Sequence, residues 1–184
     1  ADGVSVWVQD DYGEEPLRYA CYYGHLDVVQ WLHRVGASLD ATIPNGGTPL
    51  FLACAYGHLD IAQWLHGAGA ALDATDNEGG TPLHLACYKG HLDLAQWLHS
   101  GGGSLGATDK EGRTPLHHAC EGGQHVGMIS WLCSAGADAT LRNKDGGTPA
   151  QVLQEYEQDL QEYELAGLDK QAFNSTMNAL LAAE

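Results

Sequence analysis

Basic residues are scarce in this sequence: 8 lysines and arginines stand against 24 aspartates and glutamates, for a net charge of −16. Proteins that bind nucleic acid draw much of their affinity from lysines and arginines that neutralise phosphates. An anionic membrane surface likewise attracts basic segments. The charge therefore argues against both of these partners, and it is compatible with a basic partner or simply with solubility.

Long apolar runs are also missing. No stretch approaches 18 consecutive apolar residues, so we expect no membrane-spanning helix, and no signal or transit peptide is visible. The sequence has no glycine-rich phosphate loop and no HExxH motif. We therefore expect a protein that is not an enzyme. The apolar fraction of 44% is sufficient for a folded core.

What the sequence does contain is a repeat with a period of 33 residues. Thr-Pro pairs, Ala-Cys pairs and Trp-Leu pairs each recur in step along the chain. The last tryptophan interval is 34, because one residue is inserted near Gly123-Gln124. A fixed period of this length indicates stacked supersecondary units that are each too small to bury their own apolar face. The recurring positions are Thr48, Thr81, Thr114 and Thr148; Cys21, Cys54, Cys87 and Cys120; and Trp31, Trp64, Trp97 and Trp131.

The clearest unit runs from Asp76 to Thr108. Thr81 is the predicted N-cap of a first helix, with Pro82 at the first helical position and Gly90 at its end. A second helix is predicted from about Leu92, ending at the glycines that begin at Gly101. Its expected buried stripe is Leu92, Ala95, Trp97 and Leu98.

These motifs resemble the ankyrin repeat. The T-P-L-H sequence stands intact at Thr81–His84 and Thr114–His117, and G-H-L-D stands at Gly24–Asp27, Gly57–Asp60 and Gly90–Asp93. The resemblance covers about residues 3–150. It implies an all-α solenoid of antiparallel helix pairs, with β-hairpin loops that project from the stack. It further implies a concave face, formed by the loops and the first helices, that binds other proteins.

The period divides the chain into about four full repeats with partial units at both ends. Residues 1–9 align with the tail of a repeat, so we expect the chain either to be a fragment or to dock against a partner there. The last segment loses the repeat pattern, and two amphipathic helices are predicted in it as a C-terminal cap. The predicted units are 1–9, 10–42, 43–75, 76–108, 109–142 with the insertion, and 143–184.

The cysteines and histidines recur in phase, which favours structural roles. Stacked helices lie about 8–10 Å apart, whereas a disulfide needs Cα atoms within about 7 Å. We therefore expect buried, reduced thiols and an intracellular, reducing compartment. Histidine rungs at the same spacing cannot converge on one zinc ion, so we expect no metal and no cofactor. The tryptophans are expected to pack in the core.

The resemblance also identifies the positions that face the concave side: the loop tips and the last residues of each first helix. Five of the eight tyrosines fall there, and tyrosine is frequent at binding hot spots. The expected partner is another protein with basic and apolar groups. The predicted binding residues are Asp11, Tyr12, Glu14, Tyr22, Tyr23, Asn45, Tyr56, Asn77, Glu78, Tyr88, Lys89, Lys110, Glu111, Arg113 and Glu121.

Two other functions remain open on the sequence alone. The chain could be a structural subunit or assembly factor embedded in a large complex, which the uncovered start and the acidic C-terminal helices favour. It could also be the targeting arm of a larger enzyme. In all three cases the variable surface positions, and not the repeated ones, carry the function.

Overall fold

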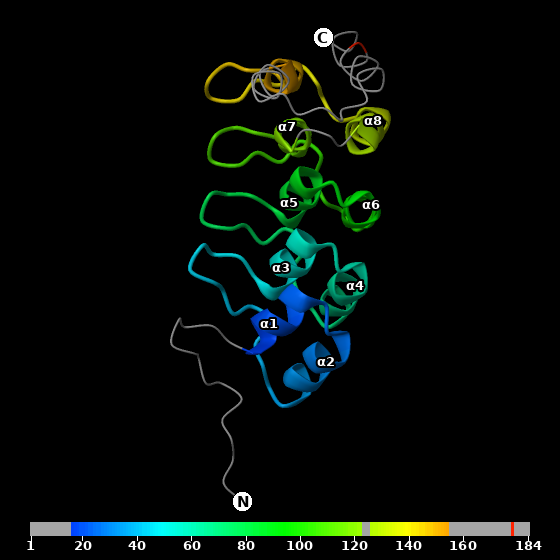
Figure 1. Cartoon of the computed structure of the whole chain (residues 1–184). Coiled ribbons are helices and arrows are strands. Elements are labelled where there is room, and N and C mark those ends of the chain that lie inside the picture. Colours follow the sequence, from blue (N-terminus) through cyan, green and yellow to red (C-terminus); the bar gives the residue numbers. More distant parts are fainter. Residues whose placement is uncertain (1–15, 123–125, 155–177, 179–184) are drawn as a thin grey trace, which may run out of the picture.

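The computed structural model describes residues 16–122, 126–154 and 178. Helices come in pairs that stack one above another along the chain (Figure 1). Residues 149–154 are helical as well, in the register of a further first helix. The pairs are α1 Pro16–Tyr23 with α2 Leu26–Arg34, α3 Pro49–Tyr56 with α4 Leu59–Gly67, α5 Pro82–Lys89 with α6 Leu92–Ser100, and α7 Pro115–Glu121 with α8 Val126–Ser134.

The first helices begin where the sequence predicts. The Thr48 hydroxyl accepts a hydrogen bond from the Phe51 N–H group, and proline follows at the first helical position. Thr81 and Thr114 go further, because a histidine three residues on bonds back to the threonine N–H group and closes a capping box. These caps fix the start of each first helix and therefore the direction of the loop that precedes it.

Glycine ends the helices α3 and α5 in the left-handed conformation, with φ of 77° at Gly57 and 75° at Gly90. The fourth repeat differs. Helix α7 is one residue shorter than its counterparts, and Gly122 is right-handed with φ of −67°. The sequence predicts a distorted turn at this point because of the inserted residue. The inserted residue itself lies in 123–125, outside the described residues.

The loops all project from the same side of the stacked first helices (Figure 1). A backbone hydrogen bond closes each turn, such as Asp76 N–H to Gly80 O at 2.9 Å. A second bond joins successive loops, as in Asn77 N–H to Asn45 O at 2.7 Å and Lys110 N–H to Glu78 O at 2.8 Å. The expected β-hairpins are thus present as closed turns. The described residues contain no β-strand, because one bond to each neighbour is too few for a ladder.

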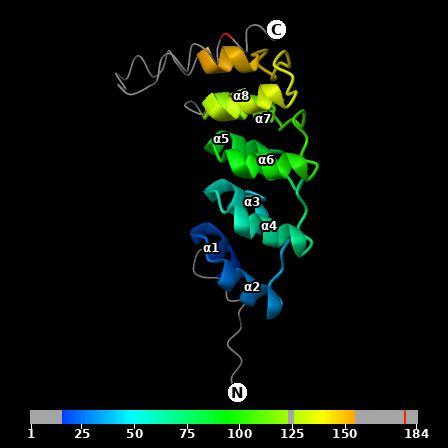
Figure 2. The ribbon, with the colours of Figure 1, turned by 90° about the vertical axis from the view of Figure 1, so that its right-hand side faces the viewer.

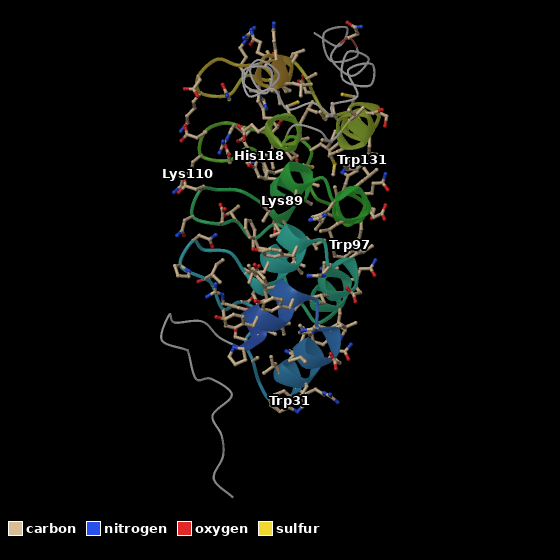
Figure 3. All side chains as sticks on the ribbon, viewed as in Figure 1. Trp31, Lys89, Trp97, Lys110, His118 and Trp131 are labelled. Atoms are coloured by element: carbon tan, nitrogen blue, oxygen red, sulfur yellow. The ribbon has the colours of Figure 1, made fainter. Side chains whose placement is uncertain are left out.

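The expected buried stripe of α6 was wrong in part. Leu94, Ala95 and Leu98 are buried, whereas Leu92 and Trp97 are only half-buried. The indole lies at the edge of the stack, where the histidine of the preceding repeat meets it edge-on. This contact recurs at His33–Trp64, His66–Trp97 and His99–Trp131, with ring centroids 5.4, 5.9 and 6.0 Å apart. Trp31, Trp97 and Trp131 lie on the second helices, on the side away from the loops (Figure 3).

In the first described repeat, apolar residues of the second helix are more exposed than their counterparts in later repeats. Val28 on α2 is 39% exposed, whereas Ile61 occupies the same position on α4 and is fully buried. Trp31 is 48% exposed, while its counterparts on the later second helices are half-buried. In each later repeat the preceding helix pair covers this surface (Figure 2). The apolar core is therefore built between repeats as much as within them.

The cysteines behave as core side chains, as predicted. All five are free thiols, and the four in repeat phase are buried. Burial raises the pKa of the Cys21 thiol to about 12, and it raises the pKa of Cys54, Cys87 and Cys120 as well. These thiols are held neutral between the helices.

Some predicted features lie outside the described residues. They include the tail of an incomplete repeat at residues 1–9, the first loop tip with Asp11, Tyr12 and Glu14, and the C-terminal cap beyond residue 154.

Candidate protein-binding surface

The loops and the first helices together form one surface, called here the groove face. It comprises the loop tips and the exposed residues of α1, α3, α5 and α7. Figure 3 places Lys110 on a loop and both Lys89 and His118 on the first helices. Trp31, Trp97 and Trp131 lie on the second helices, on the opposite side of the stack. The residues on the groove face differ from one repeat to the next, whereas the buried positions recur every 33 residues.

Four tyrosines gather on the groove face of the first two repeats. This tyrosine cluster consists of Tyr19, Tyr22 and Tyr23 on α1 and Tyr56 on α3. The Tyr22 ring centroid lies 4.1 Å from that of Tyr56 and 4.7 Å from that of Tyr23. The Tyr19 and Tyr23 rings are nearly parallel, with centroids 6.4 Å apart. All four side chains stay exposed, Tyr23 the most at 61%.

The sequence predicts three members of this cluster but misses Tyr19. The prediction considers only the two residues before the glycine that ends each first helix. Tyr19 lies four residues before Tyr23, and residues at this spacing share one face of a helix. The helical spacing was the available signal, and it would have added Tyr19 to the candidate site.

The cluster is held together by polar as well as ring contacts. A hydrogen bond joins the side chains of Tyr22 and Tyr56. Burial, this hydrogen bond and the nearby Tyr22 charge all raise the pKa of Tyr56. The Tyr56 phenol is therefore neutral at physiological pH, and its ring lies against the Tyr22 ring across the α1–α3 boundary.

A hollow of about 200 Å³ lies beside the cluster, between α1 and α3. Arg18, Tyr19, Tyr22 and Leu52 line it. Two nitrogens of the Arg18 guanidinium, Nε and one Nη, are buried. The hollow thus combines apolar walls with one basic group beneath them.

The third repeat has a different arrangement at the same positions. Tyr88 and Lys89 take the places held by Tyr22 and Tyr23 in the first repeat. The Lys89 ammonium lies over the Tyr88 ring, 5.2 Å from its centroid, which is the geometry of a cation–π contact. The His118 ring from α7 meets Tyr88 edge-on at 6.3 Å.

The fourth repeat contains a network of charged side chains centred on Asp109. Its buried carboxylate accepts bonds from Arg113 Nε at 2.8 Å and His118 Nε2 at 2.9 Å. It also accepts the N–H groups of Glu111 and Arg113. Burial raises the pKa of Asp109, but these donors outweigh burial and lower the pKa to about 2. Arg113 also pairs with Glu121 at 3.1 Å.

Two of the predicted binding residues, Arg113 and Glu121, belong to this network. Both side chains are half-buried and form an ion pair with each other, so their charged groups are already engaged within the chain. By contrast, the remaining described loop-tip residues are exposed. They are Asn45, Asn77, Glu78, Lys110 and Glu111. Asn77 additionally donates its side-chain amide to the Pro44 carbonyl at 2.9 Å, which fixes one loop against the next.

Three other histidines form hydrogen bonds between repeats. His58 Nε2 donates to the Tyr22 carbonyl at 3.0 Å, and His91 Nε2 donates to the Ala55 carbonyl at 3.3 Å. His117 Nε2 donates to the Gly147 carbonyl at 3.2 Å. Within the described ranges, no three histidine, cysteine, aspartate or glutamate side chains are grouped so that they could hold a metal ion.

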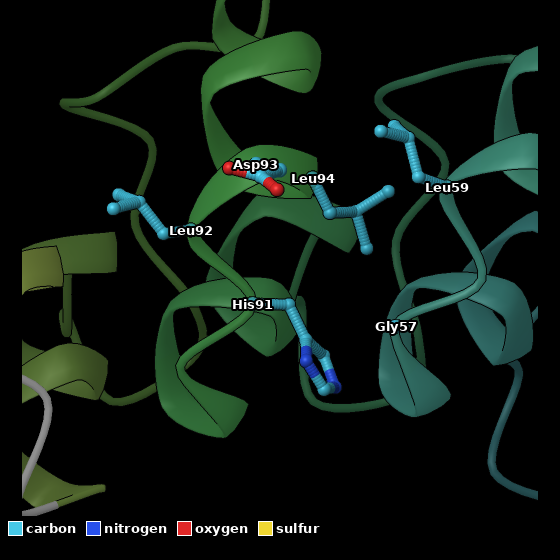
Figure 4. A pocket seen from close by; sticks show the side chains of 6 residues that line it. All are labelled: Gly57, Leu59, His91, Leu92, Asp93 and Leu94. Carbon is cyan, nitrogen blue, oxygen red and sulfur yellow. The ribbon is translucent and has the colours of Figure 1, made fainter.

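A second hollow, of about 220 Å³, lies at the turns between α3–α4 and α5–α6 (Figure 4). Gly57, Leu59, His91, Leu92, Asp93 and Leu94 line it. His91 points toward Gly57 across the repeat boundary, and its ring is already bonded to Ala55. The ring is thus engaged in joining the two repeats.

Comparison with known proteins gives the family. A family model described as ankyrin repeats in three copies matches residues 2–76 and 59–143. No curated protein matches the chain. None of the helices in the described part is long and apolar enough to cross a membrane. The chain belongs to the ankyrin repeat family, whose members generally act as protein–protein interaction modules and are typically not enzymes.

Proposed function

We propose that this protein is a non-enzymatic module that binds another protein on its groove face, chiefly through the tyrosine cluster. The observation that carries the proposal is the gathering of Tyr19, Tyr22, Tyr23 and Tyr56 in an exposed position. Large apolar rings normally gain free energy by burial, so four of them on one exposed surface are a feature of interaction sites. Tyrosine also combines contact area with a polar tip and loses little rotamer entropy on binding.

The repeat itself does not require these tyrosines. Leu52 and Leu85 take the position of Tyr19 in the next two repeats. The helices that contain them, α3 and α5, have the same length as α1. Ala55 takes the position of Tyr22. The fold therefore tolerates smaller or aliphatic residues at these places, which supports a role for the tyrosines in binding.

The partner we propose has apolar and basic groups. The hollow beside the cluster, lined by Tyr19, Tyr22 and Leu52, suits an apolar side chain. The net charge of −16 favours a basic partner and speeds its approach, with a strong dependence of the association rate on salt.

Affinity capture with two matched triple variants tests the proposal. The groove variant carries Tyr22→Ala, Tyr23→Ala and Tyr56→Ala. The control variant carries Trp31→Ala, Gln63→Ala and Gln96→Ala, which removes three exposed side chains from the second helices of the same region. Mass spectrometry then compares the proteins that each variant and the wild type retain.

We expect the groove variant to lose specific partners that the control variant keeps, with far-ultraviolet circular dichroism unchanged in both. Hot-spot truncations each cost about 1–4 kcal/mol in binding, so the loss should be clear-cut. Equal retention by the groove variant and the wild type would show that the tyrosines have no part in binding and would overturn the proposal.

A further inference from the structure

We propose that the tyrosine cluster holds a basic side chain of the partner, an arginine or a lysine, against the face of the Tyr23 ring. An apolar side chain from the same stretch of the partner fills the hollow of about 200 Å³ beside the cluster. This inference rests on the proposed function and specifies the chemistry of the bound segment. Each of its two parts follows from contacts that the chain itself makes.

The third repeat contains a cation–π contact of the kind that we propose for the partner. Lys89 lies over the Tyr88 ring at 5.2 Å. These two residues stand 66 positions after Tyr22 and Tyr23, which is two periods of the repeat. At the third repeat, therefore, the chain places its own ammonium group over the ring. In the first two repeats the position of Lys89 is taken by Tyr23 and Tyr56, which are further rings instead of a cation.

The charge around the cluster favours the same ligand. Over the described residues 16–75, the arginines and lysines are Arg18 and Arg34, and the acidic side chains are Asp27, Asp40, Asp60 and Asp73. The histidine beside the Tyr23 ring is His25, with ring centroids 6.4 Å apart. Arg34 ends α2, and its Nε donates to the Gln30 carbonyl of the same helix. Arg18 has two buried guanidinium nitrogens. A partner cation over the Tyr23 ring would meet aromatic faces in a region with more carboxylates than arginines and lysines.

The hollow and the exposed Tyr23 ring suit different groups of the partner. The hollow is lined by Arg18 together with Tyr19, Tyr22 and Leu52. The other lining residues, Tyr19, Tyr22 and Leu52, offer apolar surface, so the hollow suits an apolar side chain and the cation is expected outside it. Tyr23 is not among the residues that line the hollow, and it is the most exposed ring of the cluster. The expected segment thus carries an apolar residue close to a basic one.

Substitutions at Tyr23 separate a cation–π contact from simple apolar contact. Tyr23→Phe keeps the ring face, whereas Tyr23→Leu keeps an apolar side chain but removes the ring. The probes are three synthetic peptides, Ac-Gly-Leu-Arg-Gly-NH₂ and the same peptide with citrulline or glutamate in place of arginine. Citrulline has nearly the shape of arginine but no charge. Binding is measured from the ring signals of isotopically labelled tyrosine in NMR titrations of the full chain.

We expect the arginine peptide to bind the wild type and Tyr23→Phe with affinities within about twofold. Tyr23→Leu should weaken binding about fivefold, the factor that corresponds to a contact of about 1 kcal/mol. The citrulline peptide should bind as weakly to the wild type as the arginine peptide does to Tyr23→Leu. Tyr88→Leu is the matched control, because its ring already holds Lys89, and it should leave peptide affinity unchanged.

Three outcomes would overturn the inference. They are equal affinity of the arginine and citrulline peptides, equal effects of the phenylalanine and leucine variants, and no binding of any peptide. The same two Tyr23 variants, used in the affinity capture, keep the two proposals apart. If the triple groove variant loses its partners while Tyr23→Phe and Tyr23→Leu capture equally, the groove face binds but not through a cation. If the triple variant loses nothing, the proposed function itself is wrong.

Discussion

His84 joins the third repeat to the loop of the fourth: its Nε2–H group donates to the carbonyl oxygen of Arg113 at 3.1 Å. The same N–H group lies 3.1 Å from the Ala107 carbonyl, while Nδ1 accepts the N–H group of Thr81. This pattern needs the neutral imidazole, because a proton on Nδ1 would face the Thr81 N–H group. His84 thus ties a helix start to two points of the next loop.

The first prediction concerns pH. Burial and the neighbouring His118 lower the pKa of His84 to about 4, although its hydrogen bonds and Asp109 act in the opposite direction. In the unfolded chain the pKa is about 6.5. The unfolded state therefore binds more protons between these values, so the free energy of unfolding falls as the pH drops from about 6.5 to 4. The loss from this group should approach about 3 kcal/mol, at about 1.4 kcal/mol per pKa unit.

Urea denaturation at a series of pH values measures this effect. His84→Gln is the informative variant, because Gln151 holds the equivalent place later in the chain and accepts the Thr148 N–H group at 2.9 Å. We expect His84→Gln to flatten the pH dependence, and a second substitution, His117→Gln, to flatten it further, since burial lowers the pKa of His117 too. A variant with the same slope as the wild type would show that His84 is not the group responsible.

The second prediction concerns the carboxylate of Asp109. Asp109→Asn should lower the free energy of unfolding by about 2 kcal/mol, because hydrogen bonds from charged groups each contribute about 1.5–3 kcal/mol. Asp76→Asn is the matched control, since the Asp76 carboxylate accepts the backbone N–H groups of Glu78 and Gly80 in the corresponding turn of the preceding repeat. Its substitution should cost less than about 1 kcal/mol. Equal costs in urea denaturation would mean that Arg113 and His118 add nothing to the turn.

These two cases show how far the sequence predicts the structure. The period and the T-P-L-H motif predict the helix pairs, the threonine caps and the buried thiols, because these depend on local hydrogen bonding and on repeated apolar positions. The Asp109 network could not be predicted in the same way. His118 and Glu121 depart from the repeat pattern, and their contact with Arg113 depends on how a loop folds back on the following helix.

The candidate site was also only partly predictable. Helix-end positions identify Tyr22, Tyr23 and Tyr56, but the sequence does not show that their rings are in contact. That contact depends on the distance and rotation between α1 and α3. The tryptophans were predicted correctly only in part, because Trp97 packs against the core but remains half-buried. Its actual place at the edge of the stack follows from its size and from the imidazole of His66, which covers one side of it.

The third prediction uses two glycines of the same repeat. Gly57 has φ of +77°, and an added Cβ would lie 2.8 Å from the His91 ring. Gly57→Ala should therefore destabilise the protein by about 1–2 kcal/mol for the left-handed backbone alone, and further by displacing His91. Gly67 ends α4, and an added Cβ would meet nothing within 4 Å. Gly67→Ala should stabilise the protein by about 0.4–1 kcal/mol. Thermal unfolding of both variants tests the opposite signs, and destabilisation by Gly67→Ala would contradict the reasoning.

The last prediction compares one position in two repeats. Ile61 on α4 is fully buried beneath the preceding helix pair, whereas Val28 holds the same position on α2 and is 39% exposed. Ile61→Ala should cost about 2–5 kcal/mol, because it removes buried methyl groups and leaves a cavity. Val28→Ala should cost about 0.5 kcal/mol, as surface substitutions usually do. Because stability in repeat proteins depends on the interfaces between neighbouring units, the difference measures what a preceding repeat contributes at this position. Urea denaturation of the two single variants gives both values. A cost for Val28→Ala as large as that for Ile61→Ala would show that the outer side of α2 is covered in solution.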